Sequence, residues 1–199
     1  MFNMLFFVVM IAVILFAITV HEYAHGKVAE LFGDPTPKMS GRLTLNPLAH
    51  IDPIGFLMLV IVRFGWAKPI PINLNYFKDP EKDMALVALA GPFANFSLAV
   101  LAALLFRVIP LPGSALGIFL SSIFEYAVWI NIALGLFNLI PVPPLDGSRL
   151  LRALLPCEGQ IFVDRMEPYG FFILIFLILF PGFSSALIYL ISYFAAILI

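Results

Sequence analysis

The sequence predicts an all-α polytopic membrane protein, a bundle of about five to six transmembrane segments with a short re-entrant or β-hairpin segment. Two observations predict this class. Hydrophobic residues make up 62% of the 199 residues and charged residues only 12%, whereas soluble domains are roughly 45–50% apolar. Several apolar runs also reach the length of about 20 residues that a helix needs to cross a bilayer. The net charge of -1, without a basic cluster, excludes the nucleic-acid-binding class.

The first apolar run covers residues 2–31. It lacks a basic region at its start, and no small-residue cleavage site follows it. We therefore expect a retained spanning helix and not a cleaved signal peptide.

A shorter apolar run at residues 54–62 cannot cross a bilayer of ordinary thickness by itself. We expect it to re-enter the membrane on one side, or to cross a thinned bilayer with help from its flanks. Residues 67–73 follow it with alternating apolar and polar side chains. Pro69 and Pro71 restrict that stretch to an edge strand or an extended loop.

Two further runs, residues 84–109 and 115–140, are long enough to span. The C-terminal run, residues 171–199, is interrupted at Pro181, which favours a hairpin of two short helices over one kinked helix. No internal repeat or low-complexity linker is present. Residues 1–199 are therefore predicted to form a single membrane-embedded domain, with a core at about 2–152 and a C-terminal segment or hairpin at 169–199.

The basic residues predict the orientation in the membrane, because lysine and arginine accumulate in cytosolic loops. The turn at 110–114 carries no charge and has only Arg107 nearby. If residues 54–62 re-enter, every basic loop lies on one side and the N-terminus lies outside the cell. If they span, one basic loop lies outside. The basic residues in loops are Lys27, Lys38, Arg42, Lys68, Lys78, Lys82, Arg149, Arg152 and Arg165.

The motif "HEYAHG" ends the first apolar run. His21 and His25 are four residues apart, so a helix places both imidazoles on one face, where they can bind one zinc ion. Glu22 points about 100° away from His21 and can act as the general base beside the metal without being a ligand. Ionisable residues at this depth are costly and mark functional sites. The alternative interpretation is a histidine pair at the membrane interface.

A catalytic zinc site usually has three protein ligands, so one more is needed. The candidates by residue type are His50, Glu125, Asp146 and Glu30. Glu30 lies five residues past His25, on the wrong face of the helix. Asp146 follows the run 115–140 after a proline-rich turn, on the side where the histidines are expected. It could equally be an ordinary turn aspartate.

Three stretches in this order resemble the site-2 protease family of intramembrane zinc metalloproteases: "HEYAHG", "AGPFAN" at 90–95 and "FNLIPVPPLDG" at 137–147. Two more, "GRLTLNPLAHIDPIG" at 41–55 and "GWAKPIPIN" at 65–73, are similar to the compact microbial branch of that family, which lacks accessory domains. The resemblance extends from about residue 19 to residue 152.

The resemblance implies roles for individual residues. His21, His25 and Asp146 would bind one zinc ion per chain, and Glu22 would be the general base. Asn138 would stabilise the oxyanion or hold the substrate backbone, although such an amide can also serve as a hydrogen bond between helices. The glycine, proline and asparagine of "AGPFAN" are interpreted as packing residues next to the site.

We therefore expect a zinc metalloendopeptidase of the plasma membrane, with its active site towards the cytosol. Its substrates would be membrane proteins cut in or near a transmembrane helix, as in regulated intramembrane proteolysis. The lipid bilayer is the other expected partner, and nothing in the sequence indicates an oligomeric state. Two alternatives are a zinc transporter and a membrane metalloprotease of the prenyl-endopeptidase type, whose third ligand would be Glu125.

Overall fold

The computed structural model describes residues 2–62 and 65–199. These residues form helices and loops without any strand, apart from one isolated antiparallel bridge between Ile51 and Ala67. The α-helices are α1 (Phe2–Leu31), α2 (Thr36–Met39), α3 (Pro53–Val62), α4 (Pro80–Val108), α5 (Ala115–Asn138), α6 (Asp146–Leu154), α7 (Cys157–Met166), α8 (Gly170–Leu179) and α9 (Pro181–Leu198). Three short 3-10 helices lie at Pro47–Ala49, Leu74–Tyr76 and Glu167–Tyr169. The prediction of an all-α protein is confirmed.

Among the described helices, α1, α4, α5 and α9 are long and apolar enough to cross a membrane, which makes this a multi-pass membrane protein. By contrast, α3 and α8 have 10 residues each. That length corresponds to about 15 Å of helix, half of a hydrocarbon core of about 30 Å. The predicted count of five to six segments therefore depends on whether these two short helices lie in the bilayer.

Two of the long helices, α4 and α5, begin where the sequence supplies a cap. The Asp79 carboxylate accepts a hydrogen bond from the Lys82 amide at the start of α4, and Pro80 is the first residue of that helix. The Ser114 hydroxyl caps α5 by accepting from the Gly117 amide. α5 ends at Asn138, just before the proline-rich turn that leads into α6.

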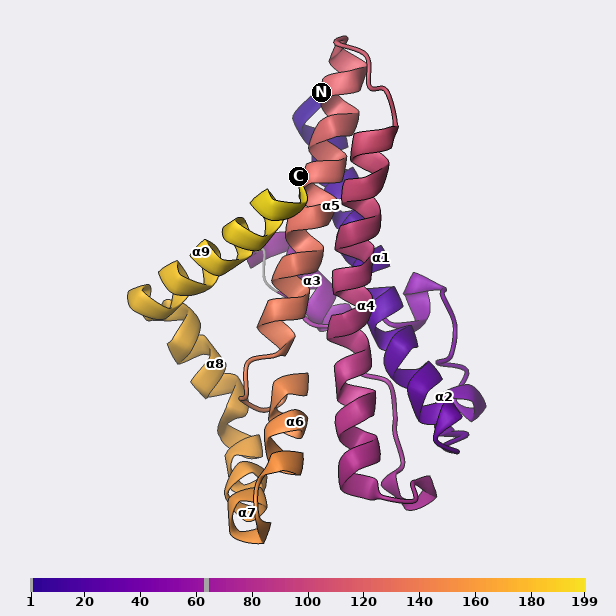
Figure 1. The fold of residues 1–199 in the computed structure, drawn as a ribbon, viewed down its shortest axis with the longest axis vertical. Coiled ribbons are helices and arrows are strands. Elements are labelled where there is room, and N and C mark those ends of the chain that lie inside the picture. Colours follow the sequence, from indigo (N-terminus) through magenta and orange to yellow (C-terminus); the bar gives the residue numbers. More distant parts are fainter. Residues whose placement is uncertain (1, 63–64) are drawn as a thin grey trace.

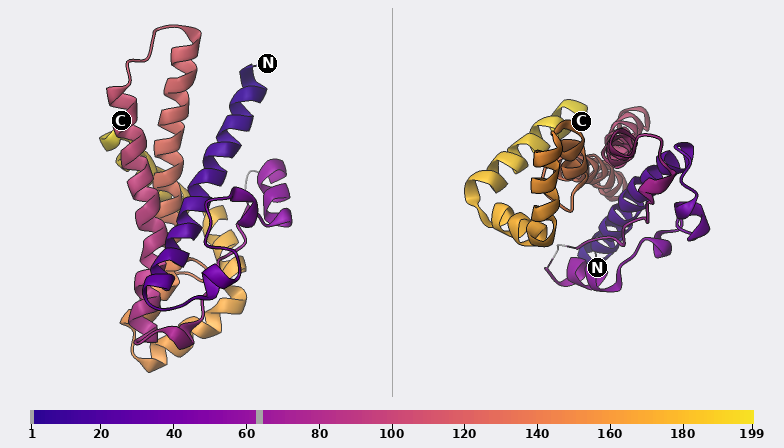
Figure 2. Two further views of the ribbon diagram at one scale, coloured as in Figure 1. Left: turned by 90° about the vertical axis from the view of Figure 1, so that its right-hand side faces the viewer. Right: turned by 90° about the horizontal axis from the view of Figure 1, so that it is seen from below.

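α4 packs against both α1 and α5 (Figure 1). Alanines on α4 allow α5 and α9 to approach it closely. They belong to a buried cluster of six residues: Ala99, Ala103, Val128, Ile132, Ile191 and Ala195. α3 lies beside α1 on the side away from α4 (Figure 2).

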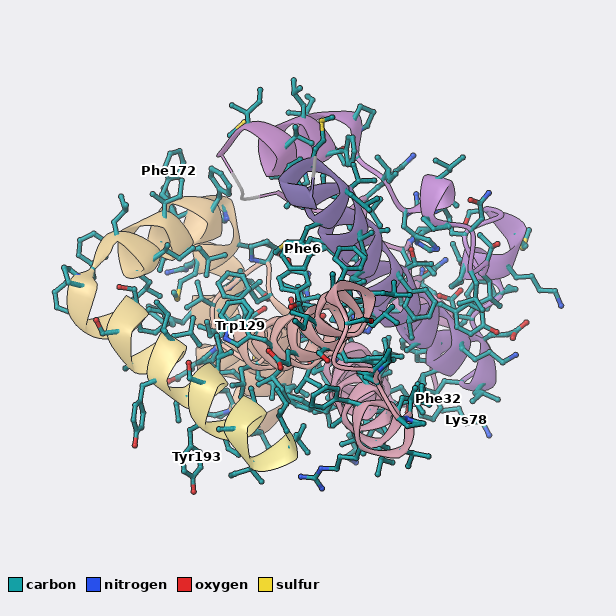
Figure 3. All side chains as sticks on the ribbon, turned by 90° about the horizontal axis from the view of Figure 1, so that it is seen from above. Phe6, Phe32, Lys78, Trp129, Phe172 and Tyr193 are labelled. Atoms are coloured by element: carbon teal, nitrogen blue, oxygen red, sulfur yellow. The ribbon has the colours of Figure 1, made fainter. Side chains whose placement is uncertain are left out.

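The C-terminal apolar run is broken at Phe180 into two helices, which form an open V in Figure 1. The break is where the sequence predicts it, because Pro181 cannot continue the hydrogen bonding of α8. Large side chains point away from this V in Figure 3, among them Phe172, with 69% of its surface exposed, and Tyr193, with 53%. Exposed aromatic surface of this extent is expected on a face that contacts lipid.

Different elements lie at the two ends of the molecule. The N-terminus and the α4–α5 turn lie at one end, and α6, α7 and the beginning of α4 lie at the other (Figure 1). α1, with 30 residues, is longer than the hydrocarbon core requires. Its C-terminal half, which carries the histidines, therefore reaches the region around α2 and α6.

Candidate active site

The structure brings three of the predicted residues together. His21 and His25 stand one turn apart on α1, and Asp146 is the first residue of α6. The two Nε2 atoms are 3.0 Å apart. The Oδ2 atom of Asp146 lies 3.2 Å from the Nε2 of His21 and 3.3 Å from that of His25. These are the only described residues that form a group of three or more possible metal ligands.

Asp146 reaches the histidines because α6 is held against the rest of the bundle. Arg152, on the second turn of α6, forms an ion pair with Glu81 at the start of α4 and with Asp164 on α7, the latter at 2.8 Å. Gly147 lies so close to the end of α5 that a Cβ atom there would be 2.3 Å from the Leu139 carbonyl oxygen. A side chain at position 147 would push Asp146 away from α1.

The hydrogen bonds of the imidazoles decide which nitrogen faces the third ligand. The Nδ1 of His25 is 2.7 Å from the Val87 carbonyl oxygen. A carbonyl can only accept, so Nδ1 carries the proton. The Nδ1 of His21 is 2.6 Å from Oδ1 of Asn95, which requires the same tautomer. In the neutral rings both Nε2 atoms then present lone pairs to each other and to the carboxylate of Asp146.

Three acceptor atoms that converge without a proton between them need a positive charge at their centre. Within the described residues, Oδ2 of Asp146 is buried without a hydrogen-bond donor. Tetrahedral zinc with bonds of about 2.0 to 2.1 Å separates its ligand atoms by about 3.3 Å. The three residues therefore fit a zinc ion.

Gly91 on α4 leaves space beside the candidate ligands. A Cβ atom at this position would be 2.4 Å from the Nε2 of His25 and 2.6 Å from the Nε2 of His21. The backbone of α4 thus passes directly beside both Nε2 atoms. The sequence indicates only close packing at "AGPFAN". The structure shows that a side chain at Gly91 would collide with both imidazoles.

Glu22 follows His21 directly and Asn138 lies eight residues before Asp146, but neither is among the three candidate ligands. The Oε2 atom of Glu22 accepts a hydrogen bond of 2.9 Å from the Ile70 amide. The extended stretch 67–73, which contains no regular strand in the part described, therefore orients the expected general base. Asn138 is the last residue of α5, and its amide nitrogen donates to the Leu134 carbonyl oxygen at 3.0 Å.

The other candidate third ligands lie elsewhere. His50 is buried in the loop before α3, where its Nε2 lies 2.8 Å from the Thr44 carbonyl oxygen. Glu125 is exposed on α5. Glu30 forms ion pairs with Lys27 and Lys38. Of the four residues considered, the structure brings only Asp146 to the histidine pair.

Comparison with known proteins agrees with this geometry. The sequence model of peptidase family M50 matches residues 108–181, which include Asn138 and Asp146. A Bacillus subtilis protein named "Putative zinc metalloprotease YwhC" is 40% identical over 175 residues, which cover 86% of this chain and 79% of the relative. This chain belongs to peptidase family M50. The resemblance to site-2 proteases is thereby confirmed.

Two further relatives of the M50 chain are also named "Putative zinc metalloprotease". A Mycolicibacterium smegmatis protein, Rip2, is 32% identical over 184 residues, with 89% of this chain and 69% of the relative covered. A Methanocaldococcus jannaschii protein, MJ0611, is 30% identical over 154 residues, with 76% and 73% covered. No solved structure matches the chain.

A large apolar cavity of about 660 Å³ lies beside the site of this M50 chain, between α1, α3, α5 and α9. It approaches the candidate ligands through Thr19, two residues before His21, and through Phe137, next to Asn138. Trp129 on α5 lines the cavity and lies inside the ring of helices in Figure 3. The cavity is only partly enclosed.

Sequence analysis of the M50 chain did not predict two side-chain contacts at the site. Asn95, interpreted as a packing residue, contacts His21 directly, and Asn131 on α5 contacts Asn95. The available signal was chemical: a side-chain amide in an apolar membrane span needs a polar partner. Which partner each amide has depends on how α4 and α5 pack, and periodicity along the chain does not contain that information.

Proposed function

We propose that this chain is an intramembrane zinc metalloendopeptidase that cuts membrane proteins in or near a transmembrane segment, as in regulated intramembrane proteolysis. One observation carries the proposal: the Nε2 atoms of His21 and His25 and the Oδ2 of Asp146 form a triangle with sides of 3.0, 3.2 and 3.3 Å. Glu22 follows the first ligand directly. The names of the relatives support the same activity.

His21, His25 and Asp146 would hold one zinc ion. When bound, zinc supplies Lewis acidity, which polarises a carbonyl group and lowers the pKa of water. Glu22 would take the proton of the attacking water and return it to the leaving amine. The Ile70 amide holds Oε2 of Glu22, so Oε1 is available for that proton.

Asn138 would act on the developing negative charge. Its amide nitrogen has two hydrogens, and one is used by the Leu134 carbonyl oxygen. The other can reach a substrate carbonyl or backbone group. A fixed donor of this kind is worth most where water is scarce.

The substrate must present an extended peptide bond, because a transmembrane helix has its carbonyl groups bonded internally. The apolar cavity between α1, α3, α5 and α9 can receive apolar side chains of an unwound segment. We propose that the cut segment lies along this cavity, with the scissile bond near Thr19 and Phe137. Such a substrate is a membrane protein with a transmembrane helix.

The distribution of basic residues supports a site that faces the cytosol across the plasma membrane. Most of the basic loop residues lie on or beside the end of α1, α2, the start of α4, α6 and α7, at one end of the molecule (Figure 1). The bridge between Ile51 and Ala67 brings the two flanks of α3 together. This pairing supports a re-entrant α3, which returns the chain to the side it left.

The two alternatives have less support. A zinc transporter needs successive ligand groups along a path through the membrane. The part of the chain that the structure describes contains one group of possible ligands. A site of the prenyl-endopeptidase type needs Glu125 as the third ligand, and the histidines face Asp146 instead.

The substitution Glu22→Gln tests the proposal. It retains an oxygen that can accept from the Ile70 amide but removes the base, so we expect unchanged zinc content and no proteolysis. Membrane proteomes of cells with wild-type or substituted protein are compared, and a substrate should accumulate uncut in the variant. Glu30→Gln is the matched control, since Glu30 lies on the same helix and pairs with Lys27. Full activity of Glu22→Gln would refute the mechanism.

A further inference from the structure

Two buried asparagines form a hydrogen-bonded chain that ends on His21. Asn95 on α4 is fully buried, and Asn131 on α5 is 4% exposed. Nδ2 of Asn95 donates to Oδ1 of Asn131 at 3.0 Å, and Oδ1 of Asn95 lies 2.6 Å from Nδ1 of His21. A buried amide is costly unless it is paired, and both amides are paired here.

The donor-to-acceptor direction of these hydrogen bonds is set by Asn131, the residue farther from His21. Nδ2 of Asn131 donates to the Ala127 carbonyl oxygen at 2.8 Å, and that oxygen can only accept. Oδ1 of Asn131 therefore faces Asn95 and requires a donor there. Asn95 supplies its NH₂ group, which also reaches the Ala17 carbonyl oxygen at 3.4 Å. Oδ1 of Asn95 is left to face His21, whose Nδ1 must then carry the proton.

The tautomer of the second histidine, His25, does not depend on other side chains. Nδ1 of His25 donates to the backbone carbonyl of Val87, which no substitution of a side chain removes. The two imidazoles are thus oriented by different means. The tautomer of His21 depends on two amides, one of which belongs to α5, a helix that carries none of the three candidate ligands.

We infer that Asn95 and Asn131 are positioning residues, which hold His21 in the tautomer whose Nε2 is free to bind metal. The inference rests on the zinc site of the proposed function and concerns how that site is maintained. Asn131 acts through Asn95. An amide without an oriented partner can present its NH₂ group to Nδ1, which selects the tautomer with a proton on Nε2 and blocks the metal-binding nitrogen.

Asn131→Leu tests the inference. It removes the nearer of the two acceptors that orient Asn95 and leaves only the Ala17 carbonyl oxygen, at 3.4 Å. We therefore expect zinc affinity to fall by roughly 10- to 100-fold, the usual effect of losing a partner of a metal-binding histidine. Affinity is measured on the full-length detergent-purified chain by competition with a chromophoric zinc chelator. Circular dichroism and gel filtration check the fold. If Asn131→Leu does not fold, Asn131→Ala makes the same comparison.

A combined variant shows whether the loss of zinc affinity comes from the orientation of Asn95 or from changed packing. A carboxylate accepts at both oxygens and has no wrong orientation, so Asn131→Leu combined with Asn95→Asp should bind zinc within a few-fold of wild type. Asn95→Leu should lose affinity like Asn131→Leu. Ser121→Ala is the control on α5, because it removes only a hydrogen bond to the Gly117 carbonyl within the helix. It should leave affinity unchanged.

Wild-type affinity in folded Asn131→Leu would overturn the inference. Equal losses in Asn131→Leu and in the combined variant would also overturn it, because the loss would then come from packing. These results leave the proposed function intact as long as the wild-type chain binds zinc and cuts. A folded wild-type chain that binds no zinc would refute the proposed function and this inference together.

Discussion

Gly91→Ala is the smallest change that should abolish the candidate zinc site. The added methyl carbon would lie 2.4 Å from Nε2 of His25 and 2.6 Å from Nε2 of His21. Real Cβ atoms essentially never approach another atom closer than 3.0 Å. The neighbours are imidazoles whose Nδ1 atoms are held by Asn95 and Val87, so the rings have little freedom to turn away.

The size of the effect follows from these distances. Each nitrogen would have to retreat by roughly half an ångström, which is the whole positional tolerance of a functional site, about 0.5 Å. The methyl group would also occupy the space beside both nitrogens where zinc has to lie, about 2.0 to 2.1 Å from each. We expect zinc affinity to fall by at least about 100-fold, the upper end of the range for perturbed metal surroundings. Proteolysis should fall to the level of Glu22→Gln.

The assay can separate this effect from misfolding. Alanine is favoured over glycine in a helix interior by about 1 kcal/mol, so α4 itself should not be weakened. We expect the purified Gly91→Ala chain to be as helical as wild type, but its thermal midpoint should no longer rise when zinc is added. Gly113→Ala is the control, because a Cβ atom there would meet nothing within 4 Å. Wild-type zinc affinity in Gly91→Ala would refute the assignment of the metal to this place.

Two other substitutions separate the roles of residues around the site. Asp146→Ala should lose zinc in chelator competition, whereas Glu125→Ala should retain it, and the reverse result would favour a ligand set of the prenyl-endopeptidase type. Asn138→Ala should keep wild-type zinc affinity but lower the cleavage rate by about 10²- to 10³-fold, as for other donors to a developing oxyanion. An unchanged rate would mean that Asn138 serves only the packing of α5.

Much of the fold could be predicted because membrane spans are determined locally. An apolar run of sufficient length must form a helix in lipid, so α1, α4, α5 and α9 follow from hydropathy. The predicted ends of the helices were less accurate. α4 begins at Pro80 and not at Met84, because the cap at Asp79 adds one polar turn to the start of the helix. The angle between α8 and α9 depends on packing against α5, and the break at Pro181 predicts only where the chain bends.

By itself, the sequence determined the class of the protein and half of the site. His21, Glu22 and His25 lie within one and a half turns of one helix, so their relative placement follows from helix geometry. The closeness of Asp146, the space at Gly91 and the tautomer of His21 were decided only by the tertiary structure. These features join residues that lie on different helices and far apart in the chain, and such distances depend on how α1, α4, α5 and α6 pack.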